Sequence, residues 1–255
     1  MNMRLKPALR WDLRNYGKGA GVFLLVMVLL TVIFTALAVA LGDEGYASFT
    51  GSAIAGTVFL LVMGIVGARE NLRMLLQNGI SRRTAFLAEL AALALISLAV
   101  SGGLTLLTAL TNRLPLGAFQ LFAADLCQLL YWTGENMEGL TSLSLGQQLI
   151  SWLFGACLML GLGLLGQFFS LLFWRLNKVW TVAAAVSIPV LLNLIPWGIY
   201  RLSLVWTAAD RMISAFFEFL CASPWNVMLV SLLASAALTG INWLLLRRTN
   251  IQAAK

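Results

Sequence analysis

Six long windows without a charged residue divide this 255-residue chain, and they constrain its fold more than any other feature. The windows are Gly19–Gly42, Gly45–Ala68, Leu90–Asn112, Gly139–Trp174, Val179–Tyr200 and Phe219–Leu246. Each is long enough for a helix that crosses a hydrocarbon core, which takes about 20 residues at a rise of about 1.5 Å. Strands of a membrane barrel would alternate polar and apolar residues over about 10 positions, and these windows do not alternate. We therefore predict an all-α membrane protein with six transmembrane helices.

The composition agrees with this class. Only 11% of the residues are charged and 60% are hydrophobic, whereas a soluble domain has about 25% charged residues. The first apolar run is longer than the 7–15 residues that are typical of a signal peptide, so it is interpreted as a retained span. We predict one transmembrane domain over residues 1–255. Its spans are expected at about 20–41, 51–68, 84–111, 146–174, 179–200 and 224–246.

The distribution of basic residues predicts the orientation of these spans. Most lysines and arginines fall in the N-terminal segment, the second and fourth connections and the C-terminal tail. Because basic residues accumulate on the cytoplasmic side, both termini are expected in the cytoplasm. The same rule explains the net charge of +7 without nucleic-acid binding, so no nucleic acid is expected as a partner.

Several classes of chemistry have no residues to support them. The chain contains no histidine, which excludes the Ser-His-Asp triad and histidine-based zinc and haem sites. It also lacks the glycine-rich loop that binds nucleotide phosphates. We expect neither an enzyme nor a cofactor in this chain. Glu89, about two turns into the third span, is either a proton or cation site or a side chain that snorkels or pairs with Arg82, Arg83 or a neighbour.

The N-terminal residues 3–18 are predicted to form an amphipathic helix that lies in the cytoplasmic interface. Leu5, Leu9 and Leu13 recur every four residues, and basic residues lie between them. This pattern is typical of a membrane-surface helix in contact with lipid. The helix either anchors the chain or transmits motion from a cytoplasmic partner.

The outer connections are expected at residues 113–144 and 201–223. The first contains a helix-like piece, "LGAFQLFAADLCQLLYW". The second is too apolar for a free loop and too charged for a further span. We therefore predict a re-entrant or interfacial outer helix before the last span.

Some features inside the spans are typical of helix packing. Gly161, Gly163 and Gly166 would permit close helix contact. Gln167 and Asn193 either serve packing or line a transport path. A disulfide between Cys127 and Cys221 is conceivable on the outer side but is not expected.

The connection between the second and third spans, "ARENLRMLLQNGISRRTAFLAEL", is predicted to be ordered. Leu72, Leu75 and Leu76 lie on one helical face. Asn78 and Gly79 supply a helix stop, because both tolerate the left-handed conformation, and Ser81 is a suitable N-cap for the third span. A short helix over residues 70–81 with an apolar face suits a groove on a partner protein.

The segment "LLQNGISRRTAFLAEL" resembles a motif common in permease subunits of bacterial ABC exporters of the ABC-2-type, or type V, fold. The resemblance extends to the layout of the chain, with an interfacial N-terminal helix, six spans, an outer helical excursion and a short basic tail. It implies a multi-pass protein of the bacterial cytoplasmic (inner) membrane. It also implies a second permease subunit, as a homodimer or a similar heterodimer, in contact with membrane lipid.

The resemblance further implies roles for particular residues. The cytoplasmic helix would be the coupling helix that docks on a separate ATPase subunit, which would bind ATP and Mg²⁺. The implied coupling residues are Glu70, Leu72, Arg73, Leu75, Leu76, Asn78, Gly79, Ser81, Arg82 and Arg83. Arg10, Trp11 and Arg14 would belong to the connecting helix beside it.

These features lead to one expected function and one alternative. The chain is expected to form the translocation path of an ATP-driven exporter for an amphipathic or hydrophobic substrate, such as a peptide or a lipid-like molecule. The alternative is a self-sufficient channel or an assembly scaffold without an ATPase partner. In that case the basic connection would serve topology alone.

Overall fold

The computed structural model describes residues 5–41, 46–48, 51–113, 120–132, 143–175, 194, 198 and 207–247. Five long helices dominate this part of the chain: α1 (Leu5–Leu41), α2 (Ser52–Gln77), α3 (Arg82–Thr111), α5 (Leu145–Arg175) and α8 (Pro224–Arg247). Each is long and apolar enough to cross a membrane. The protein is therefore an all-α, multi-pass membrane protein. Of the predicted span 179–200, only residues 194 and 198 are described, so the span as a whole and its Asn193 lie outside the described residues.

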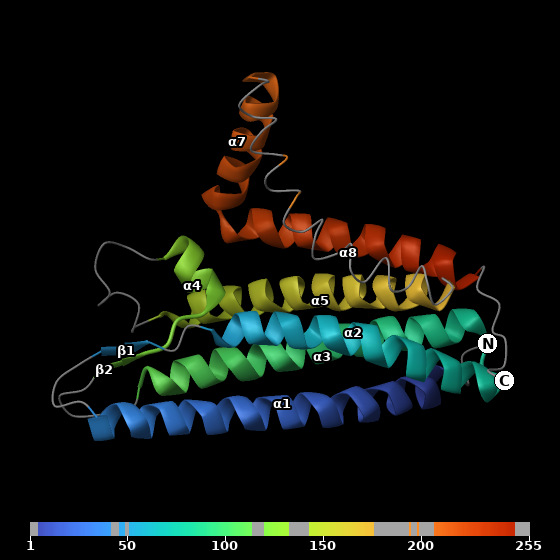
Figure 1. Cartoon of the computed structure of the whole chain (residues 1–255), viewed down its shortest axis with the longest axis horizontal. Coiled ribbons are helices and arrows are strands. Elements are labelled where there is room, and N and C mark those ends of the chain that lie inside the picture. The colour runs from blue at the N-terminus through green and yellow to red at the C-terminus, as the bar shows by residue number, and fades with distance from the viewer. Residues whose placement is uncertain are drawn as a thin grey trace.

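The long helices lie side by side along one common direction (Figure 1). The start of α1, the α2–α3 connection and the end of α8 share one end of the bundle, which we call the turn end. The opposite end, the pocket end, carries α4 (Leu126–Tyr131) and two short parallel strands, β1 (Tyr46–Ser48) and β2 (Gln120–Phe122). The piece "LGAFQLFAADLCQLLYW" is predicted to be helix-like. In the structure α4 is its helical part and β2 is a strand, so the helix is shorter than predicted.

A further helix, α7 (Thr207–Ala222), precedes the last long helix, as the sequence predicts. It projects away from the bundle and contacts α8 (Figure 1). Phe216, Phe217 and Phe219 are exposed on it. Whether this helix is re-entrant or interfacial stays a prediction.

The predicted boundary between an interfacial helix and the first span is wrong, because α1 is one continuous helix of 37 residues. Pro7 lies in its first turn, where the missing N–H costs nothing since those groups lack partners anyway. Ala8, Asp12 and Tyr16 form a buried line at four-residue spacing. The N-terminal segment thus packs against protein, and the predicted line of leucines flanks this contact. A helix of this length extends about 55 Å, well beyond a hydrocarbon core of about 30 Å.

The predicted separate helix over residues 70–81 is also wrong. Helix α2 runs without interruption from Ser52 to Gln77, and the connection to α3 is a tight turn. The segment continues the second span because it contains no glycine or proline before Gly79 that would end a helix.

A cluster of apolar side chains at the turn end joins all five long helices. Ala8 comes from α1, Leu72 and Leu75 from α2, Phe86 from α3, Leu171 from α5 and Leu246 from α8. All are buried in this turn-end cluster. It fixes the α2–α3 turn relative to the rest of the bundle.

Close approach of backbones occurs where α2 crosses α5. A Cβ atom at Gly64 would lie 2.1 Å from the carbonyl oxygen of Gly163, and one at Gly166 would lie 2.1 Å from that of Leu61. The predicted close contact at Gly163 and Gly166 is therefore confirmed, since small residues allow such helices to meet.

Candidate functional site

The α2–α3 turn ends one helix and begins the next with matched caps. Gly79 has a φ of 73°. The N–H of Ile80 donates to the carbonyl of Leu75 at 3.1 Å, and the N–H of Gly79 donates to that of Leu76 at 3.1 Å. This pair of bonds defines a Schellman motif. The side chain of Ser81 then accepts a hydrogen bond from the N–H of Thr84 at 3.2 Å, so the predicted stop and N-cap are confirmed.

The apolar face of this segment is directed inward, contrary to the interpretation that it offers a free surface. Leu72 is 0% exposed and Leu75 is buried, while Leu76 packs at the edge of the turn-end cluster. A stripe of leucines packs equally well against the chain's own helices and against a partner, and here the chain's own helices cover it.

The surface of the turn is polar and basic instead. The exposed residues of the predicted coupling set are Glu70, Asn78, Gly79, Ser81 and Arg83, and Arg73 is half-buried. On the neighbouring face of α1, Arg10, Trp11 and Arg14 are exposed at the same end.

Arg82 has an internal partner that the sequence does not suggest. Its Nη1 donates a hydrogen bond to the carbonyl of Arg247, the last residue of α8, at 2.9 Å. A cation at a helix C-terminus is stabilised by the macrodipole, typically by about 0.3–1 kcal/mol. This contact offsets the unfavourable position of Arg82 in the first turn of α3.

A group of polar residues is buried where α1 meets α2 and α3, and we call it the interior polar cluster. It comprises Asp12, Asn15, Tyr16, Asn71 and Glu89, of which all but Asn15 are buried. The Tyr16 hydroxyl donates to Oε1 of Glu89. Nδ2 of Asn15 donates to Oδ1 of Asn71 at 2.8 Å. Glu89 therefore neither snorkels nor pairs with the arginines of the turn.

A glycine makes room for this cluster. A Cβ atom at Gly67 would lie 2.2–2.7 Å from ring and hydroxyl atoms of Tyr16. Tyr16 can therefore reach Glu89 only because α2 has no side chain at this position.

A second polar pair lies between α5 and α8. Gln167 is fully buried, and its Oε1 accepts a hydrogen bond from Nδ2 of Asn242 at 3.3 Å. The same Nδ2 donates to the carbonyl of Leu164 at 3.0 Å. This contact connects the two helices; a role for Gln167 in a transport path stays a prediction.

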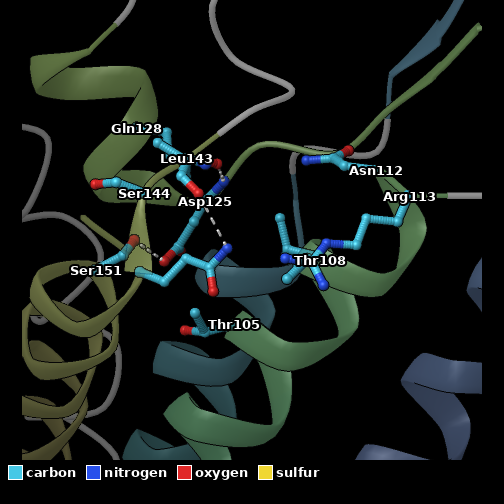
Figure 2. A pocket seen from close by; sticks show the side chains of 11 residues that line it. Thr105, Thr108, Asn112, Arg113, Asp125, Gln128, Leu143, Ser144 and Ser151 are labelled. Atoms are coloured by element: carbon cyan, nitrogen blue, oxygen red, sulfur yellow. Dashed lines mark hydrogen bonds between the residues drawn. The ribbon is translucent and has the colours of Figure 1, made fainter. Parts of the chain in front are cut away.

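A cavity of about 410 Å³ opens at the pocket end, between the end of α3, the segment around α4 and the start of α5 (Figure 2). Most of the residues that line it have a polar side chain: Thr105, Thr108, Asn112, Arg113, Asp125, Gln128, Ser144, Gln148 and Ser151, with Ala109 and Leu143. Arg113 extends from the end of α3 over the cavity toward Thr108 (Figure 2). Hydroxyl, amide and guanidinium groups in this arrangement can hydrogen-bond a small polar group.

Hydrogen bonds hold the walls of this cavity in place. The amide of Asn112 pairs with both backbone groups of Ala123, each at 2.8 Å. Asp125 is the N-cap of α4, and its Oδ1 accepts from the N–H of Leu126 at 2.7 Å. Its Oδ2 accepts from the hydroxyl of Ser151 at 2.5 Å, which connects α4 to α5 (Figure 2).

The thiol beside this cavity is inert. Burial, and secondly the negative charge of Asp125, raise the pKa of Cys127 to about 12. Cys127, Cys157 and Cys221 are free thiols in the structure. A thiol with such a pKa stays protonated at neutral pH and is a poor nucleophile.

Burial raises the pKa of the Asp125 carboxyl above its usual 3.8, although the hydrogen bonds from Ser151 and Leu126 partly oppose this. A carboxyl whose pKa is raised by folding stabilises the folded state at low pH, and this contribution is lost as the pH rises through the raised pKa. We therefore expect the melting temperature in detergent to fall, as the pH rises above the ordinary pKa of 3.8, more steeply in the wild type than in Asp125→Asn. The difference is bounded by about 1.4 kcal/mol per pH unit for one proton. Equal slopes would show that Asp125 does not titrate differently in the folded state.

Sequence reasoning singled out Glu89 but missed its partners in the interior polar cluster, and it missed the cavity. Asp12 and Tyr16 are one helical turn apart, but they lie in a segment whose basic residues indicate the membrane surface. The cavity brings together residues from three separate segments, whose pairing no local pattern reveals.

Comparison of the chain with protein-family models, curated proteins and solved structures gives no match. The class that the structure defines is therefore a multi-pass helical membrane protein with a capped basic turn at one end and a polar cavity at the other.

Proposed function

We propose that this chain is the membrane-spanning subunit of an ATP-binding-cassette exporter in a bacterial cytoplasmic membrane. In this proposal it forms the translocation path with a second permease subunit, identical or similar, and is not itself an enzyme. A separate ATPase subunit binds ATP and Mg²⁺ and docks on the α2–α3 turn. The expected substrate is amphipathic or hydrophobic, such as a peptide or a lipid-like molecule.

One observation supports this proposal most strongly: the exposed turn is attached to all five long helices of the described part. The turn-end cluster lies directly behind it, and Arg82 bonds it to the end of α8. A partner that moved the turn would therefore move several long helices together. Packed helical elements transmit displacement in this way because their side chains cannot be compressed.

The docking surface in this proposal differs from the apolar face expected from the sequence. Glu70, Arg73, Asn78 and Arg83 present charge and hydrogen-bonding groups, while Leu72 and its neighbours stabilise the turn from behind. Charged residues at the rim of an interface steer association and determine specificity more than they add affinity. Recognition by the ATPase is therefore expected to depend on charge.

Charge reversal on the turn tests the proposal. In the double variant Arg73→Glu and Arg83→Glu, we expect at least a tenfold loss of the ATPase that co-purifies with the wild-type chain in detergent. The substrate-stimulated ATP hydrolysis of the reconstituted complex should fall by a similar factor, since reversed charges on the turn would oppose the charge complementarity that the proposed docking requires. Arg83 is exposed and Arg73 is half-buried, and neither belongs to the turn-end cluster, so the fold should persist.

The matched control is Arg211→Glu, a reversal at an exposed position of α7, far from the turn. It should leave both readouts unchanged. If the double variant retains the ATPase and coupled hydrolysis, the docking proposal is wrong. If the wild-type chain, reconstituted without any ATPase, conducts flux or binds a partner unaided, the channel or scaffold alternative is correct instead.

A further inference from the structure

Two buried carboxyl groups lie together where α1 packs against α3. Asp12 and Glu89 are each 0% exposed. Glu89 acts electrostatically on Asp12, and both act on Tyr16, so the three side chains share one environment. Two ionised carboxylates in a place without water would repel each other and would each lose their hydration.

The hydrogen bonds distinguish the two acids. Glu89 accepts a hydrogen bond from the Tyr16 hydroxyl through Oε1. Neither oxygen of Asp12 has a hydrogen-bond partner in the described part of the chain. A carboxylate with a donor can retain its charge, whereas an unpaired buried charge costs several kcal/mol. Asp12 is thus the acid that must be neutral.

Basic side chains do not neutralise this pair within the described residues. The basic residues on the helices packed around it are Lys6, Arg10, Arg14 and Lys18 of α1, Arg69 and Arg73 of α2, Arg82 and Arg83 of α3, and Arg247 of α8. None of these donates a hydrogen bond to either oxygen of Asp12 or to Oε2 of Glu89. The two polar residues of α5 and α8 that are 0% exposed, Gln167 and Asn242, are uncharged.

We propose that the interior polar cluster is a proton-binding site, in which Asp12 holds one proton while Glu89 stays ionised and accepts from Tyr16. The proton turns the Asp12 carboxylate, which can only accept, into a neutral group with one O–H donor. Its release to water leaves a second negative charge between α1 and α3. Proton binding at this site therefore stabilises the attachment of α1 to the bundle.

Infrared spectroscopy of the full chain in detergent tests this assignment without any partner subunit. The background is Asp125→Asn, which removes the other buried aspartate described. We expect the C=O stretch of a protonated carboxyl at neutral pH, where an ordinary aspartate with a pKa of about 3.9 is ionised, and the loss of this band on titration with base. Asp12→Asn should abolish the band, because asparagine keeps the size and neutrality of the group but carries no proton to lose.

Glu89→Gln provides a second readout, the pH midpoint at which the carboxyl band is lost. If Asp12 were only a packing residue, this substitution would not change that midpoint. It removes the neighbouring negative charge, so the band should persist and its midpoint should move to lower pH. Labelling of the aspartate carboxyls with carbon-13 in the Asp125→Asn background should shift the band, which keeps the test valid if Asp12→Asn does not fold. No protonated carboxyl at neutral pH, a band that survives Asp12→Asn, or a band that ignores the aspartate label would overturn the proposal.

Discussion

Alanine at Gly64 or Gly166 is expected to force α2 and α5 apart. The added Cβ would lie 2.1 Å from a backbone carbonyl oxygen of the facing helix in both cases, and 3.0 Å and 3.1 Å respectively from a backbone nitrogen. A flexible side chain could move aside, but a helix backbone cannot without shifting the whole element. Overpacking costs typically 1–3 kcal/mol, and the backbone contact places each variant at about 3 kcal/mol or more. Unfolding in mixed micelles would measure this loss, and the double variant should not assemble the native bundle.

Two glycines elsewhere provide matched controls. Gly21 and Gly240 also lie within long helices, and an added Cβ meets nothing within 4 Å at either position. Alanine there should be neutral or stabilise the chain by up to about 1 kcal/mol, because glycine is the poorer helix former. Equal effects at Gly64 and Gly240 would show that the close α2–α5 crossing is not essential for stability.

The helices could be predicted from the sequence because their signal is local. A long uncharged window requires an internally hydrogen-bonded segment in lipid, and each of the five long helices overlaps most of one such window. The caps of the α2–α3 turn were equally accessible. Asn78, Gly79 and Ser81 each have a conformational preference that fixes one position of the backbone.

The partners of each face could not be predicted, because an apolar stripe or a buried acid does not specify what lies opposite. Leu72 and its neighbours fit an external groove and an internal cluster equally well by periodicity, and the structure places them in the internal one. Asp12 lies among basic residues that indicate a membrane surface, yet it faces Glu89, which lies 77 positions later in the chain. Such pairings depend on how the helices cross, which a single sequence does not record.

One pair of substitutions can distinguish the contributions that the buried and the exposed side of the α2–α3 turn make to stability. Leu72 is 0% exposed inside the turn-end cluster, whereas Met74, two residues later, is 43% exposed. Leu72→Ala should destabilise the chain by about 2–3 kcal/mol. Substitution of a buried leucine by alanine usually lowers the free energy of unfolding by about 2–5 kcal/mol. We expect the lower half of this range, because a leucine in a membrane protein loses its packing contacts but gains little from leaving water. Met74→Ala should stay within about 0.5 kcal/mol, as is usual at a surface.

Association of the same substituted chains with the ATPase is the second measurement. If Leu72 acts only behind the turn, then Leu72→Ala should weaken association with the ATPase no more than its loss of stability explains. Charge reversal on the outer side should weaken association at unchanged stability. A variant at Leu72 that unfolds normally but no longer retains the partner would place the leucine face in the interface and would require that α2 separates from the turn-end cluster when the partner docks. The stability of the free chain and retention of the partner must therefore be measured on the same two variants.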